Sequence, residues 1–151
     1  MRVLDVGSGM HPYESEGDEI THLDKYPFPH VEEVWDVEKK DMWMWTAAFD
    51  RIVARHVLEH LNEPSEFLHK CWSWLRMDGE LELVYPHKDS DEAYDNPDHK
   101  HYFSKNIIEE YLKYPELNDR FRFEVIRKEI IGSQVFLWLK KIKCTELIQN
   151  D

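Results

Sequence analysis

Three short segments of the sequence carry residues that could hold a nucleotide-like ligand. Asp5 precedes the turn Gly7-Ser8-Gly9, where missing side chains let a backbone approach a ligand closely. Asp24 stands 15 residues after Gly9 at the end of a second apolar segment, where a carboxylate can accept hydrogen bonds from both ribose hydroxyls. Asp36 follows a third segment and could accept a hydrogen bond from an exocyclic amine. Taken singly, each has a simpler interpretation, as a tight turn or a solvated aspartate.

A histidine-rich motif follows the fourth apolar segment. His56-x-x-Glu59-His60 matches the inverted zinc-protease signature, which needs a helix that presents both histidines on one face. The motif comes directly after residues 49–54, which read as a strand, and no long helix is predicted around it. We therefore expect no metal here, and local packing or capping roles for Glu59 and His60.

The polar segment 86–103 adds further candidates. Neutral imidazole is available near pH 7, so His87, His99 and His101 join His56 as possible general bases. Of these we select His56 and His99 as the catalytic candidates. A divalent metal held by Asp95, Asp98, His99 and His101 is the alternative, which Pro97 and the irregular spacing disfavour.

The elements that position these residues alternate along the chain. Apolar segments predict strands at 1–6, 20–23, 33–35, 49–54 and 80–85. A helix is predicted over 64–76, with Asn62 or Glu63 as N-cap, Pro64 in the first turn and Asp78-Gly79 as its stop. Its apolar face comprises Phe67, Leu68, Cys71, Trp72 and Leu75.

The last third of the chain predicts a second helix and a hairpin. Ser104 is the expected N-cap of the helix and Pro115 its end, with Ile107, Ile108, Tyr111 and Leu112 on one face. Segments 121–130 and 134–142 flank Gly132-Ser133 as an antiparallel hairpin. The sequence thus predicts one α/β domain over 1–151, a mostly parallel sheet with a C-terminal hairpin. Ligands of such sheets bind beyond the carboxyl ends of the strands, where the polar candidates lie.

The amino-acid composition limits the classes of molecule that this protein is expected to bind. The 151 residues carry a formal net charge of −12, which disfavours nucleic acid and anionic lipid despite basic residues near the end. No stretch is apolar enough to span a membrane. Two cysteines, Cys71 and Cys144, and a first strand that begins at once without a signal peptide lead us to expect a reduced, cytoplasmic protein.

Together these motifs resemble the class I S-adenosylmethionine-dependent methyltransferases, and most closely the compact group whose fourth-strand motif reads His-Val-Leu-Glu-His-Leu. The resemblance covers 2–114 in order and extends to the loop 95–103. The segments that carry it are Leu4–Gly9, His22–Asp24, Asp36-Val37, Phe49-Asp50, His56–Leu61 and Leu75–Leu81.

The resemblance implies a Rossmann-like fold and S-adenosylmethionine as the cofactor. Gly7, Ser8 and Gly9 would then contact its methionine part, beside Asp5. Asp24, with Lys25, would hold the ribose, Asp36 and Val37 the adenine, and Arg55 and His56 the pocket floor beside the sulfonium. The fold is expected to be N-terminally shortened, since the first strand begins at residue 2 and little more than a helical turn fits between Gly9 and Ile20.

The expected function is methyl transfer to a small-molecule or protein acceptor. A non-catalytic binding or scaffolding module is the alternative, and a metal hydrolase using His-x-x-Glu-His is a third. A thinly covered sheet face beside Tyr26, Phe28 and Trp35 further predicts a homodimer.

Overall fold

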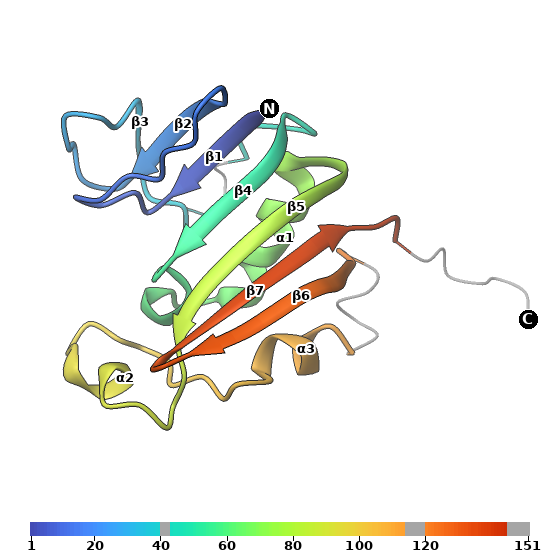
Figure 1. The fold of residues 1–151 in the computed structure, drawn as a ribbon. Coiled ribbons are helices and arrows are strands. Elements are labelled where there is room, and N and C mark those ends of the chain that lie inside the picture. Colours follow the sequence, from blue (N-terminus) through green and yellow to red (C-terminus); the bar gives the residue numbers. More distant parts are fainter. Residues whose placement is uncertain (40–42, 114–119, 145–151) are drawn as a thin grey trace, which may run out of the picture.

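A seven-stranded mixed sheet organises the chain (Figure 1). The computed structural model describes residues 1–39, 43–113 and 120–144. The strands run in the order β3-β2-β1-β4-β5-β7-β6, with β1 to β5 parallel and β7 antiparallel to both its neighbours. Their bounds are β1 Arg2–Val6, β2 Glu19–Asp24, β3 Glu33–Val34, β4 Phe49–Arg55, β5 Leu75–Pro86, β6 Phe123–Ile131 and β7 Gln134–Lys141. The predicted α/β class, mostly parallel sheet and C-terminal hairpin are confirmed.

Few helices accompany these strands. They are α1 Pro64–Trp74, α2 Glu92–Asp95, α3 Ile107–Tyr111 and a single 3₁₀ turn, η1, at Leu58–His60. Residues 7–18, between β1 and β2, form turns and extended backbone without a helix. The histidine motif therefore sits on one short turn, as its position after a strand had indicated.

The start of α1 is fixed by a side chain from another part of the chain. Pro64 occupies the first turn and Glu63 is the N-cap, one of the two residues predicted, but its own side chain makes no capping bond. The carboxylate of Glu38 instead accepts hydrogen bonds from the backbone N–H groups of Asn62, at 2.7 Å, and Glu63, at 3.4 Å. A distant carboxylate thus satisfies backbone donors that precede the helix.

The predicted stop of α1 at Asp78-Gly79 is wrong. Leu75 is already extended, with φ −79° and ψ 146°, and it pairs with Phe49 as the first residue of β5. Burial of Leu75 in the core and its pairing with β4 outweigh the helical spacing of its side chain. Asp78 takes a left-handed φ of 67° within the irregular start of β5.

The second helix is also shorter than predicted. Asn106, not Ser104, is the N-cap of α3, because the carbonyl of Ser104 accepts only a turn-type bond from Ile107. Pro115 lies outside the described residues. The polar segment 86–103, in which no helix was predicted, contains α2, one helical turn that follows Asp91.

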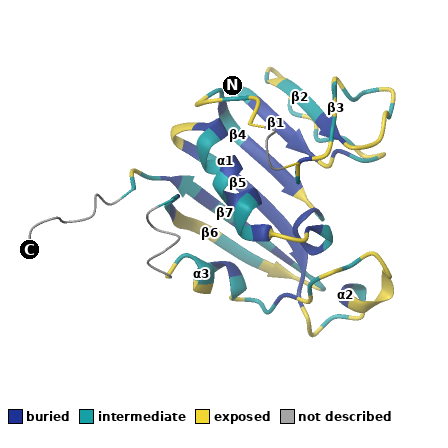
Figure 2. Ribbon diagram, turned by 180° about the vertical axis from the view of Figure 1, so that it is seen from behind, coloured by how far each residue is buried: buried dark blue, intermediate teal, exposed yellow. Residues whose placement is uncertain are grey.

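One face of the sheet is apolar and carries the helices. Leu4, Ile52, Leu81 and Leu139 are cross-strand neighbours on this face and are fully buried. Figure 2 shows α1 and α3 on the near side of the sheet, and their buried residues join the same core. From α1 and α3 that core includes Phe67, Leu68, Cys71, Trp74 and Ile108.

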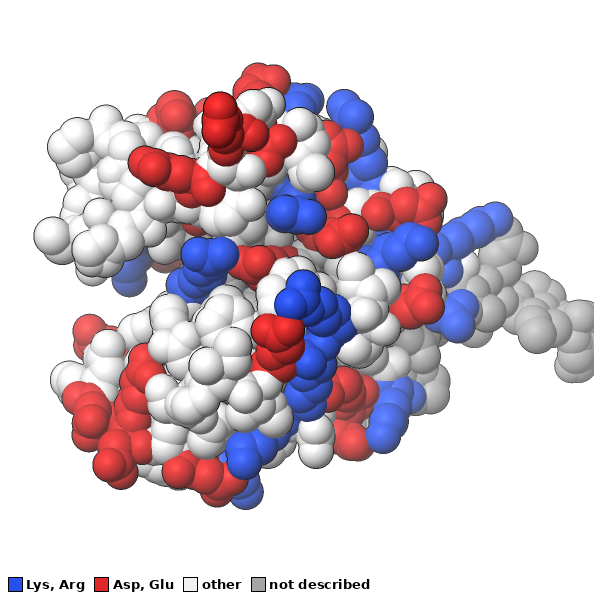
Figure 3. Space-filling model, in the orientation of Figure 1, with Lys and Arg blue, Asp and Glu red and all other residues white. Residues whose placement is uncertain are grey.

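The opposite face mixes charged residues with the buried valines Val3, Val53 and Val84, and no described helix covers it. The row next to the apolar one runs through Asp5, Val53, Glu82, Trp138 and Arg127. Glu82 accepts hydrogen bonds from Arg55 Nε and from Trp138 Nε1, both at 2.9 Å, and the Arg127 guanidinium lies 4.6 Å from the Trp138 ring centroid. Basic and acidic side chains accordingly intermingle on this face (Figure 3).

This pattern corrects one premise drawn from the sequence. An exposed apolar face was expected near Tyr26, Phe28 and Trp35, because parallel strands are usually apolar on both sides. Trp35 instead packs against Trp45 and Trp74, and the open face of the sheet carries ion pairs. Within the described ranges, no helix has the length and apolar character needed to cross a bilayer.

The polar face yields a test of stability. Replacing Glu82 by Ala removes the acceptor of both Arg55 and Trp138, and should lower the free energy of unfolding by about 1–3 kcal/mol in urea denaturation. Glu80→Ala is the matched control, because its ion pair with Arg51, at 3.6 Å, is partly exposed and worth less than about 1 kcal/mol. Equal losses in the two variants would contradict a structural role for the Glu82 contacts.

Candidate functional site

Asp24 holds the glycine turn in place at the carboxyl edge of the sheet. Its Oδ2 accepts a hydrogen bond from the Gly9 N–H at 2.8 Å, and its Oδ1 accepts one from the Tyr26 N–H at 3.0 Å. The side chain is buried, with 8% of the residue exposed. One carboxylate thus joins the loop after β1 to the loop after β2.

The glycine turn needs its two glycines. Gly7 and Gly9 have φ values of 65° and 57°, in the left-handed region that other residues avoid. A Cβ on Gly7 would also lie 2.6 Å from Cγ2 of Val57, so this turn packs directly against the residue after His56. The hydroxyl of Ser8 is 3.1 Å from Nε2 of His30.

Asp5 is a second buried carboxylate at this edge. Its Oδ2 accepts a hydrogen bond from the Tyr13 N–H at 2.8 Å and lies 2.9 Å from His22 Nδ1. Burial raises the pKa of Asp5 above its ordinary value, and the bonds from Tyr13 and His22 partly offset that rise. Asp5 therefore orders the loop that follows the glycine turn.

Two basic residues of the predicted site point elsewhere. Arg55 extends over the polar face of the sheet, where it pairs with Glu82 and its guanidinium lies 5.2 Å from the centroid of the Tyr13 ring. Lys25 is exposed, with its ammonium 5.3 Å from the Tyr26 ring centroid. Arg55 thus reaches the loop that Asp5 orders, whereas Lys25 remains at the surface.

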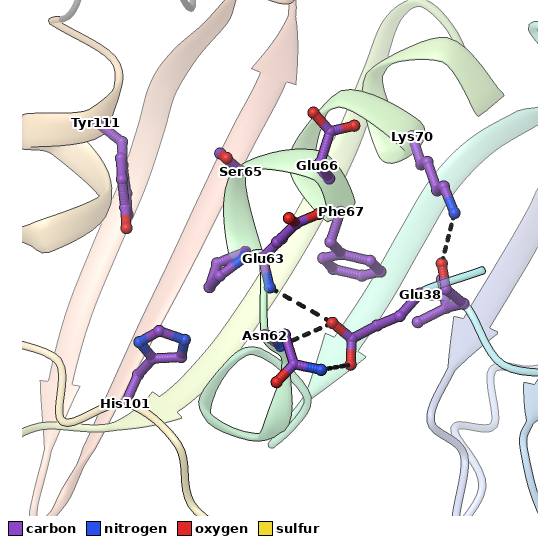
Figure 4. A pocket seen from close by; sticks show the side chains of 11 residues that line it. Glu38, Asn62, Glu63, Ser65, Glu66, Phe67, Lys70, His101 and Tyr111 are labelled. Carbon is purple, nitrogen blue, oxygen red and sulfur yellow. Dashed lines mark hydrogen bonds between the residues drawn. The ribbon is translucent and has the colours of Figure 1, made fainter. Parts of the chain in front are cut away.

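Val37 lines a groove of about 550 Å³ beside the first turn of α1 (Figure 4). The groove also contains Glu38, Lys70 and His101, and Lys70 Nζ donates to the Val37 carbonyl at 2.7 Å. Asp36 is exposed, and its Oδ1 accepts a hydrogen bond from the Glu38 N–H at 2.9 Å. Of the two residues predicted to contact the adenine, Val37 therefore forms a wall of the groove, whereas Asp36 is exposed to solvent.

His56 and His99 meet in a separate hollow of about 290 Å³. His56 has a left-handed φ of 58°, and its Nδ1 lies 3.3 Å from Oε2 of the buried Glu59. The Glu59 carboxylate raises the pKa of His56, and burial offsets part of that rise. The remaining walls are His60, Glu92, Asp95 and Asn96.

The other loop histidines are placed apart from this hollow. His87 is buried, and its Nε2 bonds to the Gly132 carbonyl at 2.9 Å, a structural contact with the hairpin turn. His101 lines the groove that contains Val37.

The sequence alone did not predict several residues that contact the candidate site residues. Tyr13, His22 and His30 complete the bonds around Asp5 and Ser8, and Glu59 was expected only to pack or cap. The alternation Glu19–Asp24 puts His22 on the polar face beside Asp5, because the two residues are direct cross-strand partners. The strand register was the one feature that could have predicted the contact between His22 and Asp5. It can be used only once the pairing of β1 with β2 is known.

A family model described as a methyltransferase domain matches residues 1–132. The chain belongs to this methyltransferase domain family. The match spans the glycine turn, Asp24, the histidine motif and α1, and it confirms the resemblance to class I methyltransferases. The closer resemblance to the compact group with the His-Val-Leu-Glu-His-Leu motif stays a prediction.

Solved methyltransferases share the fold at low sequence identity. An S-adenosylmethionine-dependent methyltransferase of Aquifex aeolicus is 17% identical with a TM-score of 0.70, covering 94% of this chain and 82% of its own. The 1,6-didemethyltoxoflavin N1-methyltransferase of Burkholderia thailandensis is 18% identical with a TM-score of 0.70, covering 94% and 71%. A Haloferax volcanii protein, solved in complex with the Trm112 methyltransferase activator, is 9% identical with a TM-score of 0.68, covering 94% and 83%. No curated protein matches the chain.

The two hydrogen bonds that Asp24 accepts should stabilise the fold even when no ligand is bound. Asp24→Ala removes two hydrogen bonds to a charged acceptor and should cost about 2–4 kcal/mol in chemical denaturation. Asp36→Ala serves as the control, since this exposed aspartate accepts one local bond and should cost less than about 1 kcal/mol. A loss at Asp24 no larger than that at Asp36 would show that the carboxylate does not hold the glycine turn.

Proposed function

We propose that this methyltransferase domain binds S-adenosylmethionine and transfers its methyl group to a small-molecule or protein acceptor. The observation that carries the proposal is the Asp24 carboxylate, fixed by Gly9 and Tyr26 at the carboxyl edge of two parallel strands. A buried acidic residue there, beside a glycine turn, is the arrangement that accepts ribose hydroxyls in nucleotide-binding α/β folds. The related Burkholderia enzyme was solved with S-adenosylhomocysteine bound.

The residues around Asp24 fit such a cofactor. Each Asp24 oxygen accepts one backbone bond and retains a lone pair for a ribose hydroxyl. Gly7, Ser8 and Gly9 leave backbone free to approach the methionine part, with Asp5 behind them and Lys25 at the rim. Val37 and Asp36 would contact the adenine, and His56 would form the floor. Arg55, paired with Glu82, would contribute only through the loop around Tyr13.

The methyl group on the sulfonium is the electrophile that the cofactor supplies when bound. The chain's own residues then have to orient the acceptor and exclude water. A general base assists if the acceptor is a hydroxyl or a protonated amine, and His56 and His99 face the same hollow. Both are assigned to acceptor activation.

The binding test uses calorimetric titration with S-adenosylmethionine and with S-adenosylhomocysteine. We expect saturable binding of both, weakened at least about tenfold in Asp24→Asn because an amide offers one acceptor oxygen where the carboxylate offers two. Asp78→Asn is the matched control; this aspartate lies in the irregular first part of β5, at the opposite end of the strands, and Asn tolerates its left-handed φ. Thermal unfolding of each variant checks that the fold survives.

Two outcomes would contradict the proposal in different ways. Binding that is unchanged in folded Asp24→Asn would remove Asp24 from the cofactor site. Absence of binding by the unmutated chain would favour the alternative, a methyltransferase fold retained as a binding or scaffolding module, and the activator bound to the Haloferax protein illustrates protein partnership in this fold.

Two further expectations complete the proposal, a cytoplasmic location and a homodimer. Trp35 packs against the core, so the exposed Tyr26 and Val34 would supply the apolar contact of the dimer. Because the net charge of −12 opposes association, the dimer should strengthen with salt. Light scattering across dilution at low and high salt tests this. A mass near 18.3 kDa under all conditions would contradict the homodimer.

A further inference from the structure

Glu59 is a buried carboxylate that lacks hydrogen-bond donors. The residue is 1% exposed, and among the described residues no group donates a hydrogen bond to either Oε atom. In the described part of the chain its one ion-pair partner is His56, whose Nδ1 lies 3.3 Å from Oε2. Its backbone is firmly held, since the Glu59 carbonyl accepts bonds from Lys100 at 2.7 Å and His101 at 3.3 Å. Buried carboxylates are normally hydrogen-bonded, paired or bound to a metal, so these orphaned oxygens need an explanation.

Two half-buried histidine rings stand next to it, and a hydrogen bond orients one of them. Nδ1 of His99 donates to the Ala93 carbonyl at 2.8 Å, which leaves Nε2 with a lone pair when the ring is neutral. His60 is half-buried, and its ring packs edge-on against the ring of His99. Imidazoles that bind metals are commonly oriented as that of His99 is, through a hydrogen bond from their second nitrogen to a backbone carbonyl.

The donor atoms of the three side chains converge. One atom each from Glu59, His60 and His99 lies within 4.8 Å of the other two. The His60 and His99 rings are 4.8 Å apart between centroids and nearly perpendicular, at 78°. Ligands of a tetrahedral ion are about 3.4 Å apart for bonds of about 2.1 Å, a spacing that modest rotation of half-buried rings can reach.

The hollow in front of these donors is open and acidic. Glu92 and Asp95 contribute to its walls together with Asn96 and His56. A cation entering it would meet carboxylates of the rim and then the three converging donors. Coordination positions on the cavity side would remain accessible to water.

We propose that Glu59, His60 and His99 bind one divalent transition-metal ion. Two imidazoles and one carboxylate favour zinc, manganese or ferrous iron over calcium and magnesium, which prefer oxygen ligands. In the hydrolase motif His56 and His60 would be ligands and Glu59 a base, whereas here Glu59 is a ligand and the second imidazole comes from the loop before α3. This proposal replaces the expectation from sequence that no metal binds, and it does not depend on S-adenosylmethionine binding. With the metal bound, His99 is a ligand and no longer a general base, so His56 alone remains for acceptor activation.

The first test is calorimetric titration of tag-free, chelator-treated protein with Zn²⁺ or Mn²⁺. We expect one saturable equivalent, with affinity reduced at least tenfold in His99→Ala and in Glu59→Gln, and weaker binding of Mg²⁺. His11→Ala is the matched control for adventitious binding, because His11 is exposed and outside the cluster, and its affinity should equal that of the unmutated chain.

The second test separates ligation from packing. Added metal should raise the melting temperature of the unmutated chain but not that of Glu59→Gln, which is compared with its own metal-free melting temperature. If Glu59→Gln fails to fold, the same comparison is made with His99→Ala, which changes a half-buried residue. The site would be disproved by absence of saturable binding, by equal affinity in His99→Ala, or by an equal loss in His11→Ala.

Discussion

The whole arrangement depends on a single apolar layer between the sheet and the helices α1 and α3. Rows of buried aliphatic residues, such as Leu4, Ile52, Leu81 and Leu139, meet Phe67, Leu68 and Trp74 of α1 in one core. Because the described helices lie on this face alone, the other face has to be compatible with water. Strand β7 accordingly alternates between buried and partly exposed residues, and β4 and β5 place charged residues such as Arg55 and Glu82 on that face. The pairs formed by Arg55, Glu82 and Trp138 are the result of this constraint.

Short connections impose a second requirement, which acidic side chains meet. Loops without helices leave backbone N–H groups that need acceptors. Asp5 accepts from Tyr13, Asp24 from Gly9 and Tyr26, and Glu38 from the backbone ahead of α1. Part of the acidic excess thus has a structural use, and it concentrates carboxylates at the edge of the sheet where the glycine turn lies.

Most elements that depend on short-range sequence patterns were predicted correctly. All seven strands were placed to within a few residues, except the start of β5, and the glycine turn, Asp5 and Asp24 lie together as expected. The end of α1 was missed because Leu75 is helical in spacing but pairs with Phe49 in the sheet. Convergence of Glu59 with His99 was missed for a related reason. It depends on backbone bonds from Lys100 and His101 to the Glu59 carbonyl, which join segments about 40 residues apart.

The strand order has a consequence for synthesis on the ribosome. β1, made first, lies in the interior of the sheet, and β5 gains its second neighbour only when β7 has emerged, because β6 pairs with β7 and not with β5. Until then the nascent chain exposes a twelve-residue edge, β5, that carries Leu81, Leu83 and Tyr85 with unpaired backbone groups. Such an edge is a template for pairing with other chains. The late hairpin therefore serves as the closing strand pair that protects the central sheet from aggregation.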